Sequence, residues 1–197
     1  MTFEPQPTEL IGEHIHLKPL QSSHYIELWP HANERDIWRY MPFGDINSLE
    51  KMKWLVSEML RRQALGNDVL FAQIDPITRT AIGMTRYMTI ERANKSLEIG
   101  GSWLSKAYRR TPINTEAKYL LMRHAFETLG AIRLQFRTDT RNERSQRAIE
   151  RIGAVREGVL RKNILMPDGY QRSSVIYSVL DEEWPGVKQK LEALLEK

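Results

Sequence analysis

Cysteine is absent from this sequence, so disulfides, thiolate nucleophiles and thiolate metal ligands are excluded. The sequence also lacks an apolar run long enough to cross a bilayer. Its beginning, MTFEPQPTEL, has neither the basic region nor the apolar stretch of a signal peptide. We therefore expect a cytoplasmic protein that does not associate with membranes, since a reducing compartment suits a chain without cysteine.

Net charge is also small: 29 Lys and Arg against 25 Asp and Glu give +4 at pH 7. This value favours anionic partners only mildly. A length of 197 residues suits one domain with a single sizeable core. Because residues 1–10 contain two prolines, we expect a loose lead-in there, followed by a single domain over residues 11–197.

Hydrophobic periodicity predicts strands and helices in a mixed order. Strands are expected at residues 14–20, 69–75, 80–90, 96–105, 131–139, 154–162 and 173–180. Helices are expected within 21–34, over 48–66, 112–129 and 141–153, and within 182–197. The aromatic segment 36–45 contains Pro42 and Gly44, which indicates a loop. Gly100 and Gly101 weaken their strand and suggest a bulge.

Glycine is missing where phosphate-binding loops usually carry it, in the segment AYRRTPINTEAKYLL. Pro112 suits the first helical position, and Thr111 is a natural N-cap. The amides of residues 113–115 then point out of the helix start, at the positive end of its dipole. The segment is therefore either a phosphate site or a capped helix beside the solvated Arg109 and Arg110.

A second motif, TDTRNERSQRAIERIG, joins a strand to a helix. Asn142 stands at the junction, Ser145 follows in the first helical turn, and Gly153 stops the helix. Taken alone, both polar residues are explained by ordinary capping.

Together, the strand LEIGGSWLS, the helix start RRTPIN, the strand IRLQFRTD, the N-x-x-S pair and REGVLR resemble the GNAT superfamily of acyl-CoA N-acyltransferases. The similarity covers residues 10–181 and is closest to the branch of ribosomal-protein-alanine N-acetyltransferases. It implies one α/β (α+β) domain with a mixed, mostly antiparallel sheet of about six to seven strands flanked by helices. Strands 96–105 and 131–139 would be parallel and splayed, with acetyl-CoA between them and its pyrophosphate at residues 111–115.

The resemblance also implies roles for single residues. The thioester oxygen would be polarised by a strand amide near Trp103 or Leu104. Ser145 is assigned as the proton donor to the leaving thiolate, because Ile149 replaces a tyrosine that many members use. The implied cofactor-binding residues are Trp103, Leu104, Arg109, Arg110, Thr111, Pro112, Ile113, Asn114, Thr115, Asn142 and Ser145. Pro112 and Asn114 stand where the family loop has small residues, and Arg110 is expected to compensate with its charge.

We expect the amine acceptor to enter between the early helices and the C-terminal strands. Glu98 is the candidate catalytic base, because its strand precedes the helix start; the alternative is a surface carboxylate. Trp38 and Tyr40 are expected to line an acceptor pocket, to which Glu34 and Asp36 would attract a cationic amine. The histidines lack the spacing of a metal site, so no metal is expected.

The implied reaction is transfer of the acetyl group of acetyl-CoA to a primary amine by direct attack in a ternary complex. The acceptor is a protein N-terminal α-amine or a small-molecule amine; an α-amine, with a pKa near ~8, needs only a weak base. Two alternatives remain: a non-catalytic acyl-CoA-binding protein of the same fold, and a nucleic-acid-binding module built on the arginines between residues 137 and 151. The sequence leaves the acceptor, the acyl-chain length and the oligomeric state open, with a homodimer among the options.

Overall fold

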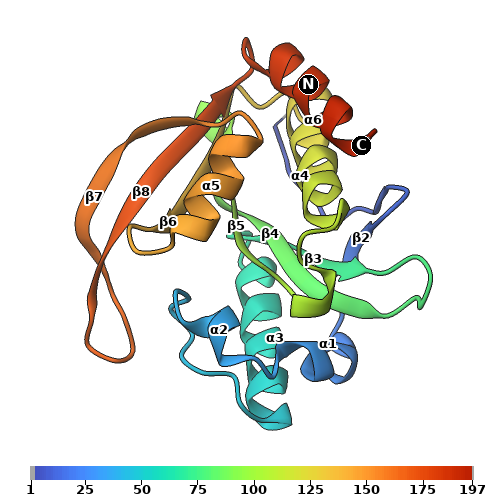
Figure 1. The fold of residues 1–197 in the computed structure, drawn as a ribbon, viewed down its shortest axis with the longest axis vertical. Coiled ribbons are helices and arrows are strands. Elements are labelled where there is room, and N and C mark those ends of the chain that lie inside the picture. Colours follow the sequence, from blue (N-terminus) through green and yellow to red (C-terminus); the bar gives the residue numbers. More distant parts are fainter. Residues whose placement is uncertain (1–2, 197) are drawn as a thin grey trace.

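The computed structural model describes residues 3–196, which form one mixed sheet with helices on both faces (Figure 1). The strands are β1 (Leu10–Ile11), β2 (His16–Pro19), β3 (Val69–Ile74), β4 (Ala81–Glu91), β5 (Ser96–Leu104), β6 (Arg133–Asp139), β7 (Val155–Leu165) and β8 (Gln171–Leu180). The helices are α1 (His24–Ala32), α2 (Arg35–Trp38), α3 (Leu49–Ala64), α4 (Ile113–Arg123), α5 (Glu143–Arg151) and α6 (Trp184–Leu195). A π-helical segment, His124–Thr128, continues α4.

Within the described residues the strand order is β1-β2-β3-β4-β5-β6-β8-β7, and β5 with β6 is the one parallel pair. The predicted mixed, mostly antiparallel sheet is confirmed, with eight strands instead of six to seven. The additional strand is β1, in which Leu10 pairs with Leu17 of β2. Two residues are too few to show the alternation from which a strand is predicted.

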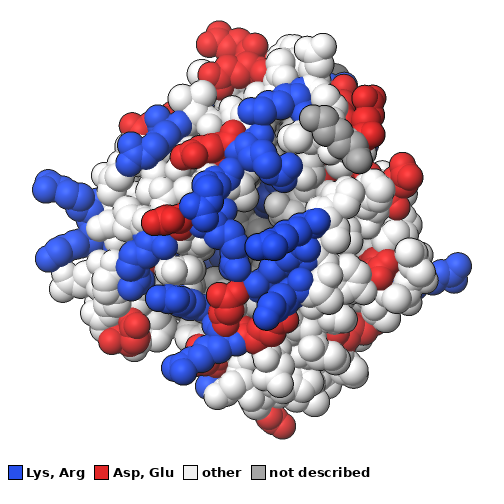
Figure 2. Space-filling model, in the orientation of Figure 1, with Lys and Arg blue, Asp and Glu red and all other residues white. Residues whose placement is uncertain are grey.

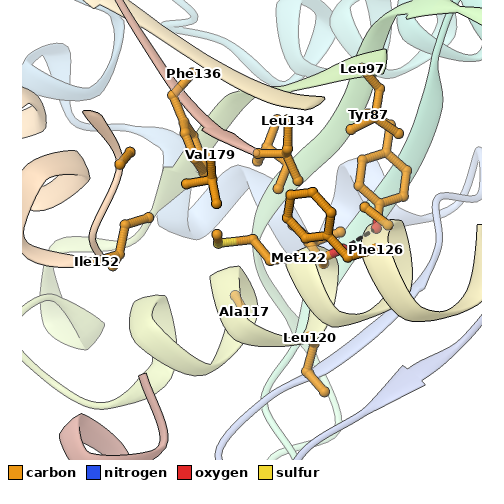
Figure 3. Close-up of a cluster of buried hydrophobic side chains, with 14 of the residues drawn as sticks. Tyr87, Leu97, Ala117, Leu120, Met122, Phe126, Leu134, Phe136, Ile152 and Val179 are labelled. Carbon is orange, nitrogen blue, oxygen red and sulfur yellow. Dashed lines mark hydrogen bonds between the residues drawn. The ribbon is translucent and has the colours of Figure 1, made fainter. Parts of the chain in front are cut away.

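Two apolar clusters lie on opposite faces of the sheet. The first packs α4, α5 and α6 against it; Figure 3 shows Leu97 of β5 and Leu134 and Phe136 of β6 in this cluster with Ala117 and Met122 of α4. The second packs α1, α2 and α3 against β3, β4 and β5. Among the described residues, this second cluster includes none from β6, β7 or β8. The second face of those strands must therefore be filled in another way.

The segment before β1 is packed, which corrects the expectation of a loose lead-in over residues 1–10. Phe3 is 5% exposed within the first apolar cluster, and Glu4 forms an ion pair with Arg92 at 2.8 Å. Residues 1–2 lie outside the described part of the chain. Prolines made the composition of this segment resemble a linker, but one buried aromatic side chain is enough to hold it on the domain.

Glu116 in α4 fixes the next part of the N-terminal segment. Its carboxylate accepts hydrogen bonds from the backbone amides of Glu13, His14 and Ile15 at 2.9, 2.6 and 2.9 Å. A side chain at Gly12 would collide with this carboxylate, so glycine is needed there. These contacts anchor the first turn of α4, which forms one wall of the site.

Candidate active site

The parallel strands β5 and β6 diverge after a short paired stretch. Residues 96–98 pair with residues 133–135, although β5 continues to Leu104 and β6 to Asp139. Beyond this stretch β5 has β4 on one side and no described strand on the other. The predicted splay is confirmed, and it leaves a strand edge able to pair with an extended ligand. Figure 2 shows Lys and Arg gathered around a hollow on the face that carries α4 and α5.

A β-bulge interrupts β5 at its two glycines, which is one of the two features, a bulge or a close backbone approach, that a glycine pair in a strand suggests. The register with β4 shifts between Met84 and Arg86, and Gly101 has a left-handed φ of +58°. A Cβ at Gly101 would lie 3.0 Å from Arg86 Nε, so the backbone conformation and the close contact both favour glycine. Trp103 and Leu104 follow, and their side chains are buried. Only their backbone groups are therefore available to a ligand in the cleft.

The start of α4 forms the wall of the cleft at residues 110–115. The first intrahelical hydrogen bond runs from the Glu116 amide to the Pro112 carbonyl at 2.9 Å, so the amides of residues 113–115 precede the helical ladder. Thr111 was predicted to be the N-cap of α4, but Pro112 occupies that position. The Thr111 hydroxyl instead donates to the Tyr108 carbonyl at 2.7 Å. Arg110 is exposed and has a left-handed φ of +64°, a backbone conformation that glycine adopts more readily than arginine.

Arg109 joins the end of β5 to α2 instead of standing free. Its guanidinium lies 2.7 Å from Asp36 and 3.8 Å from Glu34, and Arg144 reaches the same Asp36 at 3.1 Å. Hydrogen bonds from Arg109, and then from Arg144, lower the pKa of Asp36. The two carboxylates expected to attract a cationic amine are therefore already neutralised by arginines.

The start of α5 lies opposite, where Asn142 caps the helix. Its side-chain oxygen accepts from the Ser145 amide at 3.1 Å, which places Ser145 in the first turn. Ile149 is 8% exposed within the first apolar cluster. Arg151 bridges to α4, where it donates to the Thr115 hydroxyl at 2.8 Å.

The arginine run between residues 137 and 151 is largely paired within the protein. Its partners are Glu98 for Arg137, Asp139 for Arg141, Asp36 for Arg144 and Glu143 for Arg147. A nucleic-acid-binding surface needs charges that are free to meet phosphates. The pairing therefore removes most of the support for the nucleic-acid-binding alternative.

Glu98 is buried, so the alternative of a surface carboxylate is wrong. Its side chain is 4% exposed, and Arg137 lies 3.1 Å from its carboxylate. Gln135 donates to the same group at 3.0 Å. A carboxylate oxygen accepts more than one hydrogen bond, so Glu98 retains capacity toward a further donor.

Trp38 and Tyr40 have different surroundings. Trp38 is 2% exposed, donates its indole N–H to the Ala32 carbonyl at 2.8 Å and packs 5.5 Å from the ring of Trp103. It belongs to the core, which corrects its assignment to an acceptor pocket. Tyr40 is partly exposed, and its carbonyl accepts from Arg172 at 2.9 Å.

Polar side chains, most of them without a role predicted from the sequence, lie together on the second face of the sheet, and we call this set the polar row. It consists of Arg86 (β4), Glu98 (β5), Arg137 and Asp139 (β6), and Arg172 and Ser174 (β8). Apart from the partly exposed Arg137, these residues are buried. The alternation of apolar and polar residues in IRLQFRTD indicates that one face of this strand is polar. It does not indicate that other parts of the chain bury this face.

Two absences apply to residues 3–196. No group of three or more His, Asp or Glu side chains in this range is arranged to hold a metal ion. None of its helices combines the length and the apolar character needed to cross a membrane.

Comparison with known proteins decides the family. Residues 14–155 match the family model described as an acetyltransferase (GNAT) domain. The chain belongs to the GNAT family. Over 106 residues, this GNAT protein is 34% identical to "Putative ribosomal N-acetyltransferase YdaF" of Bacillus subtilis (strain 168), which covers 54% of this chain and 57% of that relative. It is 26% identical over 159 residues to "Probable N-acetyltransferase YjcK" of the same organism, covering 79% of this chain and 88% of the relative.

Solved structures agree with this assignment. A "putative acetyltransferase" from T. thermophilus is 41% identical, with a TM-score of 0.88 over 97% of this chain and 98% of that one. A ribosomal-protein-S5-alanine acetyltransferase from Vibrio fischeri has a TM-score of 0.73 over 90% of this chain and 98% of that one. At 19% identity, the second likeness shows the fold alone.

Proposed function

We propose that this GNAT protein moves the acetyl group of acetyl-CoA to a primary amine by direct attack in a ternary complex. The observation that carries the proposal is the open edge of β5, which leads to the start of α4. Pantetheine is extended and contains amide groups, so it suits an unpaired strand edge. A pyrophosphate suits the amides of residues 113–115, with the exposed Arg110 beside them. The named relative YdaF supports a protein N-terminal α-amine as acceptor.

The chemistry needs few catalytic groups. A backbone amide near Trp103 or Leu104 would polarise the thioester oxygen while the neutral amine attacks the carbonyl carbon. The carbon–sulfur bond then breaks, and the Ser145 hydroxyl would donate a proton to the departing thiolate while it regains one from solvent. Glu98 would take the proton that the amine loses, through a water molecule. Positioning both reactants in one cleft supplies much of the remaining rate.

Acetyl-CoA binding is tested first by thermal unfolding. Millimolar acetyl-CoA should raise the melting temperature, because the ligand binds the folded state. Arg110→Ala should weaken this binding by about 1–3 kcal/mol, and the loss should shrink for a truncated pantetheine thioester without phosphates. An unchanged melting temperature with acetyl-CoA would reject the cofactor site. Equal losses with both thioesters would show that Arg110 acts through the fold.

Catalysis is tested with a panel of N-terminal peptides, lysine peptides and small amines. Glu98→Gln should lower turnover by a factor at or below ~10², and higher pH should restore part of the rate because solvent then supplies neutral amine. Ser145→Ala should show no such rescue, because it removes a donor near the sulfur. An unchanged rate and pH profile in Glu98→Gln would remove Glu98 from the mechanism.

A non-catalytic acyl-CoA-binding protein is the second candidate. Pro112 and Asn114 in the loop and Ile149 in α5 favour it, because they replace residues that GNAT enzymes often use. Binding of acetyl-CoA without turnover of any amine in the panel would support this candidate. A cytoplasmic location and a homodimer also remain predictions.

A further inference from the structure

The polar row contains more positive than negative groups. Three of its members are arginines and two are carboxylates. With their ion-pair partners Arg62, Asp68 and Arg141, the count becomes five arginines to three carboxylates. The pairing between Arg172 and Asp139 is loose, at 4.0 Å. An anion entering the row would therefore find guanidinium groups that are not fully matched.

The row also holds every buried side-chain polar atom that lacks a hydrogen-bond partner within residues 3–196. These atoms are Arg86 Nε, Arg172 Nε and Ser174 Oγ. Arg172 is 7% exposed and Ser174 is fully buried, so bulk water does not complete their hydrogen bonds. Folded proteins rarely leave such groups unpaired, because each one lowers stability. Their concentration in one place indicates a site that a ligand completes.

The cover over the Arg172 end of the row is an irregular segment, residues 39–47, whereas Met59 of α3 contacts Arg86 at the other end. Arg172 donates to the Tyr40 carbonyl at 2.9 Å, and the Arg86 guanidinium lies 5.9 Å from the centre of the Phe43 ring. A small cavity of about 10 Å³ beneath this segment is lined by Arg86, Gly101 and Phe43 among others. Access of a ligand to the row therefore requires movement of a short irregular segment and leaves the sheet intact.

We propose that Arg172 and Ser174 bind a carboxylate carried by the amine acceptor. The inference rests on the proposed function and names the substrate class of the same site. Arg172 Nε–H and the Ser174 hydroxyl are both without a hydrogen-bond acceptor, and one carboxylate has the capacity to accept from two donors. β6 separates β5 from β8, and the register places Glu98 opposite Gln135 and Ser178. Ser174 lies four residues away along β8, so two strand spacings and four residues separate it from Glu98, a distance of ~16 Å. The acceptor class is thus a primary amine with an acidic group ~16 Å away, such as an extended peptide with an acidic fifth residue, at ~3.4 Å per residue.

Ser178 provides a matched control for Ser174. Both serines are buried on the same face of β8, but the Ser178 hydroxyl donates to Glu157 at 2.8 Å. Ser174→Ala removes an unpaired group, so the melting temperature of the free protein should stay the same or rise. Ser178→Ala removes a formed hydrogen bond and should lower it by about 2–4 °C.

The experiment compares two C-terminally amidated pentapeptides that begin with serine, continue with three alanines and end in glutamate or in glutamine. With the parent protein, the glutamate peptide should raise the melting temperature more. Its kcat/KM with acetyl-CoA should be at least ~10-fold higher, the size of one charge-assisted hydrogen bond. Ser174→Ala should reduce the kcat/KM preference to about threefold or less and should shrink the difference in melting temperature between the two peptides. Ser178→Ala should keep both the kcat/KM preference and the difference in melting temperature.

The two readouts separate this inference from the proposed function. A preferential thermal shift without turnover would uphold the carboxylate site and reject catalysis. Turnover of both peptides at equal efficiency and without a differential shift would uphold catalysis and overturn the carboxylate site. Retention of the full preference in Ser174→Ala, or the absence of any preference in the parent, would also overturn it.

Discussion

Lys118 in α4 reaches into the opening between the splayed strands, and its burial makes stability depend on pH. Its ammonium donates to the Ser102 hydroxyl of β5 at 2.7 Å and lies 5.9 Å from the centre of the Phe136 ring of β6. Burial lowers the pKa of Lys118 from 10.5 to about 7. The folded protein therefore releases this proton at a pH where the unfolded chain still holds it.

The sign follows from the proton count. Between pH 7 and 10.5 the unfolded state binds more protons at Lys118, so the free energy of unfolding rises with pH in this window. Below pH 7 both states are protonated and the cost of burying the ammonium is constant. The full shift corresponds to at most about 5 kcal/mol, at ~1.4 kcal/mol per pKa unit. Because the side chain is only partly buried and can relax toward solvent, we expect Lys118→Met to stabilise by about 1–3 kcal/mol at pH 7.

Urea unfolding at pH 7 and pH 9.5 measures this effect. The gain from Lys118→Met should be largest at pH 7 and should shrink at pH 9.5, because the parent lysine is then neutral in the folded state. Lys190→Met changes an exposed lysine of α6 and should show no pH-dependent gain. A Lys118→Met gain of equal size at both pH values would refute the reasoning, as would a loss at pH 7.

Two further changes test the packing around the site. Asp68→Asn leaves the buried Arg86 without its charged partner and should cost ~3–5 kcal/mol in urea unfolding. Glu58→Gln breaks an exposed pair and should hardly move the unfolding midpoint, so similar losses for both would contradict the role of burial. Glu116→Gln should weaken the hydrogen bonds to the amides of residues 13–15, cost about 1–3 kcal/mol and speed their hydrogen exchange. Unchanged exchange at these amides would show that the carboxylate does not hold the segment.

Much of the local structure around the proposed cofactor site was predictable because its features are local. The Asn142 cap joins residues three apart, and the bulge follows from two adjacent glycines. Such features depend on backbone sterics and hydrogen bonds within one turn, which sequence patterns encode directly. The wrong prediction at Thr111 is also local. Its hydroxyl donates to the carbonyl of the preceding turn instead of accepting from an amide of α4, and capping rules do not decide between these two nearby partners.

The acceptor side was not predictable in this way, because its residues meet only through strand pairing. Asp139 and Ser174 are direct neighbours across β6 and β8, yet the sequence of neither segment indicates that the two strands pair. Local patterns also failed for burial. Glu98 and Trp38 lie in segments that indicated a surface group and a loop residue, and both are buried. Burial depends on what covers a residue, and for the polar row the cover includes the distant segment 39–47.

The alternation of side chains along β6 places both halves of the site on one strand. Phe136 points into the apolar cluster with α4, on the side where acetyl-CoA is proposed to lie, and Arg137 points to the polar row and pairs with Glu98. Direct transfer requires both reactants at the same time, so the two faces must be held at a fixed distance. A single strand fixes this distance by its own geometry, without domain closure. The need to bind both reactants at once also explains the unpaired hydrogen-bond donors of the polar row. Groups arranged to bind the amine substrate stay unpaired until that substrate is bound.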